Sequence, residues 1–179
     1  SLVPDDEGGA RLAVGHLVSL GRRRIAHITG PERFEAVRLR HRGYAAALSA
    51  AGIAEDPALY LSGSWSESWG REAVAKLYGD GRTDEPDAIF CGNDQIARGA
   101  VEALRERGIA VPQSVAVAGF DNWNVMTEAA RPPLTSVDMN LEALGREAGR
   151  LLIEMIGGAS VAGVRRLPCT LVVRGSSVA

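Results

Sequence analysis

Apolar positions recur along the chain with two different periods, and the two patterns alternate from one end to the other. Apolar residues three or four positions apart indicate amphipathic helices, whereas short runs of apolar and β-branched residues indicate strands. The helical pattern covers residues 9–20, 38–51, 68–78, 95–107 and 141–156. The strand pattern covers residues 24–28, 58–63, 87–92, 114–120 and 170–175, with an extended segment at 132–137. This alternation predicts βαβ units.

The helix at 9–20 is predicted to bury one apolar face. That face would consist of Leu12, Ala13, Leu17 and Leu20. Asp5 and Asp6 lie just upstream and are candidates to cap the helix.

Two of the strands, at 88–91 and 115–120, are apolar on both faces. Strands of this kind belong to parallel sheets that are covered by helices on each side. We therefore predict one α/β unit, doubly wound, with a mostly parallel sheet and helices on both faces. Ligands of such folds bind outside the carboxyl ends of the strands.

Polar residues follow three of the predicted strands. Ser64, Trp65 and Ser66 come after the strand at 58–63, Asn93 and Asp94 after 87–92, and Asp121 and Asn122 after 114–120. These strand ends would share one edge of the sheet. An aromatic ring, an amide and a carboxylate are therefore expected to converge there.

The composition excludes several other classes of protein. With 179 residues, 46% hydrophobic residues and a net charge of -2, the chain is typical of an ordinary globular domain without a general affinity for nucleic acid or membranes. Cys91 and Cys169 form no CxxC pair, and the three histidines have no metal-binding spacing, so neither a metal nor a cofactor is expected. No stretch has the length of a signal peptide core or a transmembrane span, which favours a cytoplasmic protein. A start at "SLVPDD" without Met is typical of a fragment.

The sequence lacks the motifs of common α/β enzymes. Neither GxGxxG nor GxxxxGK[ST] occurs, and "SGSWS" lacks the second glycine of a nucleophile elbow. Asp94 and Asp121 as paired acids for glycoside cleavage rank low, because nothing in the sequence argues for a raised pKa. The edge of the sheet therefore indicates ligand binding in preference to catalysis. An α/β enzyme stays a further alternative, which measurable turnover would reveal.

The candidate residues each have a structural alternative. Trp65 can stack on the C–H face of a sugar or pack on its own loop. For Asn93, the spacing favours a helix cap and a ligand contact equally. Asp94 is expected to be the N-cap of the next helix. Asp121 can bind adjacent hydroxyl groups, and either Arg38 or Arg40 can offer a planar set of donors to the same edge or lie in solvent.

A series of motifs along the chain carries a resemblance to a known family. In order, these are "GGARLAVGHLVSLGRRRIAHITGP", "RLRHRGYAAAL", "GSWSESWG", "PDAIFCGNDQIARGA", "GIAVPQSVAVAGFDN", "RPPLTSVDMNLEALGREA" and "LVVRGS". Together they resemble the effector-binding region of LacI-type (lactose-repressor, galactose-repressor) transcription regulators over nearly the whole chain. The resemblance implies a periplasmic-binding-protein-like fold of two α/β subdomains, with a small effector bound in the cleft between them.

The resemblance assigns ligand contacts to four residues of this chain: Arg40, Trp65, Asn93 and Asp121. The "SWS" around Trp65 favours a sugar or sugar-like effector over a purine. A further contact position, usually polar in the family, falls on Met139, which cannot hydrogen-bond well.

The resemblance also predicts which part of the regulator this chain represents. Residues 1–136 and 159–179 would form the C-terminal subdomain, and 137–158 a crossover segment and a helix that packs on the first subdomain. DNA would be bound only through an N-terminal helix-turn-helix domain that is absent here. A homodimer is expected, without catalytic activity. A sugar-binding protein of a transport system is the alternative interpretation.

Overall fold

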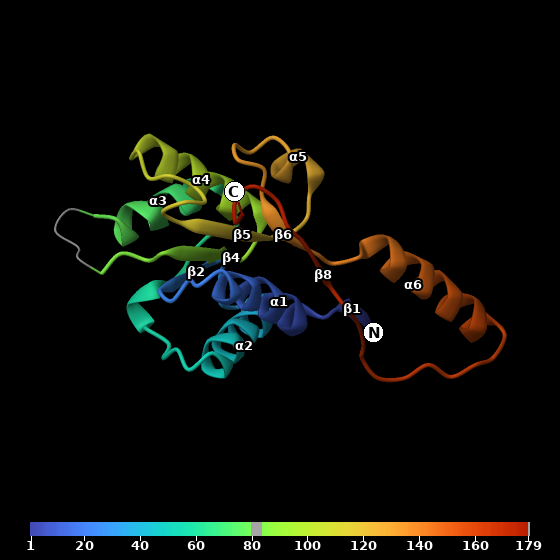
Figure 1. Ribbon diagram of the computed structural model, residues 1–179. Coiled ribbons are helices and arrows are strands. Elements are labelled where there is room, and N and C mark those ends of the chain that lie inside the picture. Colours follow the sequence, from blue (N-terminus) through green and yellow to red (C-terminus); the bar gives the residue numbers. More distant parts are fainter. Residues whose placement is uncertain (80–83, 179) are drawn as a thin grey trace.

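The computed structural model describes residues 1–79 and 84–178, and its elements alternate as the sequence pattern predicts (Figure 1). The helices are α1 (Asp6–Ser19), α2 (Glu35–Ala50), α3 (Glu67–Leu77), α4 (Asp94–Glu106), α5 (Asn124–Thr127) and α6 (Leu141–Ile156), with a 3-10 turn η1 (Pro57–Leu59). The strands are β1 (Leu2–Pro4), β2 (Ile25–Thr29), β3 (Tyr60–Ser62), β4 (Ala88–Cys91), β5 (Ala116–Asp121), β6 (Thr135–Asp138), β7 (Arg165–Leu167) and β8 (Thr170–Val172).

Six of the strands form one sheet in the order β3-β2-β4-β5-β6-β8. All neighbouring pairs are parallel except the last, in which β8 runs antiparallel to β6. The predicted doubly wound, mostly parallel sheet is thus confirmed. Strands β2 and β4 are buried along their whole length, as expected for a sheet that is covered on both faces.

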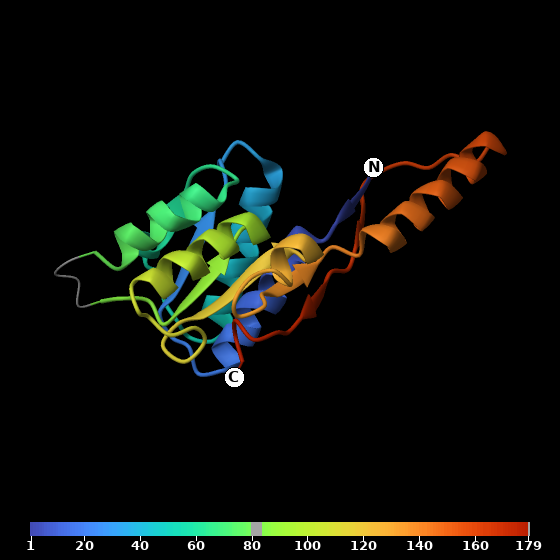
Figure 2. The same ribbon diagram turned by 90° about the horizontal axis from the view of Figure 1, so that it is seen from above.

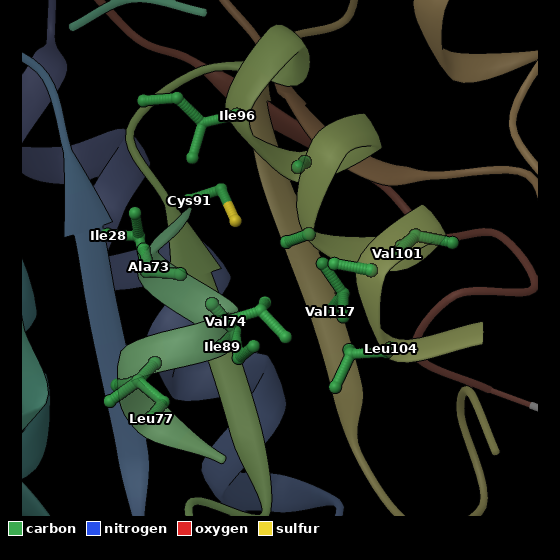
Figure 3. Packing of buried hydrophobic residues seen from close by; sticks show 14 of the residues in the cluster. Ile28, Ala73, Val74, Leu77, Ile89, Cys91, Ile96, Val101, Leu104 and Val117 are labelled. Carbon is green, nitrogen blue, oxygen red and sulfur yellow. The ribbon is translucent and has the colours of Figure 1, made fainter. Parts of the chain in front are cut away.

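Helices cover the two faces of this sheet in pairs (Figures 1 and 2). On one face, α3 and α4 place Val74, Leu77 and Leu104 against Ile89 and Val117 of the sheet (Figure 3). On the other face, α1 and α2 pack in the same way. The cluster there includes Ala10, Val14, Leu17, Tyr44, Leu48, Phe90 and Phe120.

The predicted inner face of α1 is partly wrong. Ala13 and Leu17 are fully buried, but Leu12 and Leu20 are 45% and 40% exposed. The buried stripe runs through Ala10, Ala13, Val14 and Leu17. The small residues let α1 approach the sheet closely, whereas the larger Leu12 lies beside this stripe.

A second, smaller unit of structure projects from the main body. Strands β1 and β7 pair in parallel as a separate two-stranded sheet, and α6 lies beyond them, away from the six-stranded sheet (Figures 1 and 2). Several apolar side chains of α6 are exposed: Leu141, Leu152, Ile153, Met155 and Ile156. Among residues 1–79 and 84–178, no helix is long and apolar enough to cross a membrane.

Candidate functional site

Arg40 occupies the centre of the predicted edge. It is 6% exposed, and its Nε donates to Oδ1 of Asp6 at 2.8 Å. Nη1 donates to the backbone carbonyl of Gly92, directly after β4, and lies 3.8 Å from Oδ1 of Asp121 at the end of β5. The guanidinium also stacks on the ring of Phe120, 3.6 Å from its centroid. One buried cation thus joins α1, α2 and the ends of two strands.

Helix α2 is held so that Arg40 reaches this position. The hydroxyl of Tyr44, one turn further along the same helix, donates to the carbonyl of Ile25 at 2.7 Å. Arg38, the other arginine of the "RLR" motif, points elsewhere and forms an exposed ion pair with Glu35. The prediction that one of the two arginines faces the edge is therefore met by Arg40.

Asp121 has an unusual backbone and a perturbed carboxyl group. Its φ is 107°, in the region that L-residues rarely adopt, and its side chain is 32% exposed. Burial raises the pKa of the Asp121 carboxyl to about 6, opposed by the positive charge of Arg40 and supported by the negative charge of Asp6. The carboxyl group is thus accessible and held beside a buried cation.

Trp65 lies against the end of β2, and Gly30 makes room for it. A Cβ atom at Gly30 would lie 2.3 Å from the indole ring of Trp65, so no other residue fits without displacing the ring. The indole is 5.9 Å from the guanidinium carbon of Arg40 and 6.2 Å from the ring of Phe34. The tryptophan therefore packs on its surroundings and also stands beside the polar group.

Asn93 is the N-cap of α4, and the prediction that Asp94 caps this helix is wrong. Oδ1 of Asn93 accepts from the backbone N–H of Ile96 at 2.9 Å, which leaves its amide Nδ2 free for a weaker contact of 3.5 Å to Gln95. The helix begins at Asp94, one residue earlier than the sequence pattern indicated. Capping uses the oxygen of Asn93 alone, so its amide nitrogen stays a candidate donor to a ligand.

The carboxyl group of Asp94 points away from the helix end and into the protein. It accepts hydrogen bonds from the backbone N–H of Trp123 at 2.8 Å and from the hydroxyl of Ser136 at 2.6 Å. Burial raises the pKa of Asp94 to about 7, although both hydrogen bonds oppose the rise. The negative charge of Asp121 adds to the rise in the pKa of Asp94, so the two carboxyl groups lie within electrostatic range of each other. Nothing in the sequence had pointed to these raised pKa values.

The sequence analysis did not identify two residues that shape the site. Asp6, considered only as a helix cap, forms a buried ion pair with Arg40, while Asp5 is the cap and accepts from the N–H of Gly8 at 3.0 Å. Phe120 provides the ring below Arg40. Neither role has a local signal, because each depends on a partner far away in the sequence.

An open hollow adjoins these residues on the side of β6 and α6. It has a volume of about 560 Å³ and is lined by Asp121, Asn122, Trp123, Asn124, Val125, Met139 and Leu141. Met139 is within 3.9 Å of Nη2 of Arg40. The donors, acceptors and aromatic ring at this edge suit a small polyhydroxylated ligand, whose hydroxyl groups pair with polar groups and whose C–H face covers a ring. Among the residues that the structure describes, no group of three or more potential ligands could hold a metal ion.

Comparisons with known proteins show which family the chain resembles. A family model described as "Periplasmic binding protein-like domain" matches residues 14–177. The transcriptional regulator CelR of Thermobifida fusca is 40% identical over 96% of this chain, and the transcriptional repressor CytR of Escherichia coli K12 is 35% identical over 92%. The chain spans about half the length of these relatives, 50% and 48% respectively. The solved structure of a CelR–cellobiose complex superposes with a TM-score of 0.88 at 38% identity, over 98% of this chain and 53% of that one. These relatives are regulators of transcription, which favours that class over a transport protein or an enzyme.

Proposed function

The chain belongs to the family of periplasmic binding protein-like domains found in LacI-type transcription regulators, and on this basis we propose that it senses a sugar effector. The effector would bind at the edge formed by Arg40, Trp65, Asn93 and Asp121. In the complete protein, binding would change the affinity of a separate DNA-binding domain for its operator. Such a regulator would act in the cytoplasm.

The buried Arg40 beside the accessible Asp121 is the observation that carries this proposal. A guanidinium donates and a carboxylate accepts, so adjacent sugar hydroxyl groups can pair with both at once. Trp65 supplies an apolar face at the same edge, and Nδ2 of Asn93 supplies a further donor. Because these groups are held by contacts within the protein, little ordering is required when the ligand binds.

The open hollow and the projecting unit suggest where the other wall of the site would stand. The six-stranded sheet and the helices on its faces would form one lobe, and the projecting unit with β1, β7 and α6 would lie at the crossing to a second lobe that covers α6. An effector between the two lobes would favour their closed arrangement only to the extent that it binds that arrangement more tightly. In a homodimer, closure would alter the spacing of the paired DNA-binding domains. The chain alone would then hold half of the site and bind its effector weakly.

A titration of the 15N-labelled chain with cellobiose, followed by NMR, tests this proposal even if binding is weak. Cellobiose is the first choice because it is bound in the related CelR complex. We expect shifts of the Trp65 indole and Asn93 side-chain amide signals. The indole N–H of Trp69, which donates to the carbonyl of Thr29 at 2.9 Å inside the protein, serves as the internal control and should not move. If cellobiose and a panel of other mono- and disaccharides leave Trp65 and Asn93 unshifted, the proposal is wrong.

A further inference from the structure

The loop that follows β5 carries two consecutive non-glycine residues with positive φ. Asp121 has a φ of 107° and Asn122 a φ of 51°. Asn adopts a φ near 50° readily, but a φ of 107° at Asp121 is rare for an L-residue and needs a restraint from the surrounding structure. This restraint also decides where the carboxyl group of Asp121 points.

A chain of hydrogen bonds from α4 and β6 holds the loop. Oγ of Ser136 accepts from the backbone N–H of Asn122 at 3.0 Å and donates to Oδ1 of Asp94 at 2.6 Å. Oδ2 of Asp94 accepts from the backbone N–H of Trp123 at 2.8 Å. Asp94 and Ser136 thus bind the two amides that directly follow Asp121.

The two side chains have little freedom to move. Asp94 is 1% exposed and Ser136 is fully buried. A Cβ atom at Gly119 would lie 2.4 Å from Oδ1 of Asp94, so the glycine in β5 makes room for the carboxyl group. The restraint on the loop is therefore part of the core and is itself fixed by packing.

We infer that Asp94 and Ser136 are positioning residues that set the affinity for the effector by holding Asp121 beside Arg40. This inference rests on the proposed function. Neither residue would touch the ligand. If the two amides were released, Asp121 could relax to negative φ, and its carboxyl group would turn away from the position 3.8 Å from Arg40.

Four variants separate positioning from general stability. Ser136→Ala removes the acceptor of the Asn122 N–H, and Asp94→Ala removes the carboxyl group that binds both Ser136 and Trp123. Ser136→Thr keeps the hydroxyl. Thr135→Val is the matched control, because Thr135 is the next residue in β6, is fully buried, and its Oγ1 accepts from the N–H of Arg174 at 2.8 Å.

Two readouts of each 15N-labelled variant test the inference. The first needs no ligand: the amide–Hα coupling constant of Asp121 reports φ, and hydrogen exchange reports protection of the Asn122 and Trp123 amides. The second is the affinity for cellobiose. For Ser136→Ala and Asp94→Ala we expect a changed coupling constant, faster exchange and an affinity weakened about tenfold or more, as about 1.4 kcal/mol of lost interaction implies. Thr135→Val should lower the melting temperature without either effect. Ser136→Thr should keep the coupling constant and the amide protection of the parent chain, although its added methyl group in the core lowers the melting temperature.

The two kinds of failure can be told apart. If the parent chain binds no sugar, the proposed function is wrong, while the coupling constant and the exchange rates still decide whether Asp94 and Ser136 hold the loop. If both variants keep the coupling constant and the protection of the parent chain, the inference is overturned. It is also overturned if the loop relaxes and the affinity for cellobiose stays the same.

Discussion

The guanidinium of Arg40 lies 3.8 Å from the carboxyl group of Asp121, although strands β3 and β4 come between the two residues in the sequence. The same guanidinium forms a buried ion pair with Asp6 at 2.8 Å. One cation thus faces a carboxylate that is committed to the fold and another that is open to a ligand. This division of roles leads to the first prediction.

Replacing Arg40 should affect both folding and binding. Arg40→Met leaves Asp6 buried without its partner, and we expect a loss of about 3–5 kcal/mol in the free energy of unfolding. Arg40→Lys keeps the charge, so its loss of unfolding free energy should be smaller than that of Arg40→Met. Some loss should remain, because Lys cannot donate to Asp6 and Gly92 in the same planar arrangement. Urea unfolding measures both values. Equal stability of Arg40→Met and the parent chain would contradict the role assigned to this ion pair.

The two functions of Asn93 can be separated by substitution. Asn93→Ala should cost about 0.5–2 kcal/mol in unfolding free energy through loss of the helix cap. It should also abolish the shift of the Trp65 indole NMR signal on addition of sugar. Asn93→Ser keeps a cap oxygen but removes the amide donor. We expect it to retain nearly all the stability and still to bind sugar poorly. Wild-type affinity in Asn93→Ser would show that the amide has no part in binding.

Gly30→Ala tests whether the position of Trp65 matters. The new methyl group would displace the indole ring, since its Cβ would lie 2.3 Å from the ring atoms. We expect a change in Trp fluorescence and a loss of sugar binding comparable to that of Trp65→Ala. Gly15→Ala, in a helix position where a Cβ meets nothing within 4 Å, is the control and should leave both signals unchanged.

Ionisation of Asp94 and Asp121 should lower stability as the pH rises through the weakly acidic range, whereas the buried His27, whose pKa burial lowers to about 3, acts in the opposite direction. The pKa of Asp94 is raised from 3.8 to about 7 and that of Asp121 to about 6, mainly by burial. A carboxyl group with a raised folded-state pKa stabilises the fold fully only below its unfolded pKa, and this contribution is lost as pH rises through the folded pKa. Thermal melts between about pH 4 and pH 8 measure the slope. In Asp94→Asn the melting temperature should fall less steeply with pH. An unchanged slope would contradict the raised pKa of Asp94.

The exposed apolar residues of α6 predict self-association of the isolated chain. Leu152, Ile153 and Ile156 are 59%, 72% and 79% exposed. Exposed apolar patches of this kind are typical of association sites, because contact of apolar surface with water is unfavourable. Light scattering at increasing concentration should show species larger than the monomer. Ile156→Glu should reduce them, whereas Ala159→Glu, which adds the same charge just beyond the helix, should not. A strictly monomeric chain at high concentration would argue against this surface as an association site.

The order of elements could be predicted from the sequence because each buried segment carries its own periodicity. The prediction that Trp65, Asn93 and Asp121 share one edge followed from topology, since the ends of parallel strands lie side by side; the structure places Trp65 and Asp121 beside Arg40. Short strands such as β1 and β7 gave no usable pattern in three residues.

Other features depend on details that periodicity does not contain. Asn93 and Asp94 are both good capping residues, and a shift of one position in the helix start exchanged their roles. The Arg40–Asp6 pair joins residues on different helices, and the loop after Asp121 is held by a hydrogen bond from the Asn122 N–H to Ser136 of β6. Long-range partners of this kind become visible only in the folded structure.

Calorimetry of the complete regulator with a panel of sugars that includes cellobiose tests the central claim most directly. We predict that one sugar binds, and that Trp65→Ala and Asp121→Ala each weaken its binding, whereas Gly15→Ala, at a helix position far from the four assigned contacts where an added Cβ meets nothing within 4 Å, leaves it unchanged. Tight binding that is unaffected by both Trp65→Ala and Asp121→Ala would contradict the proposed site.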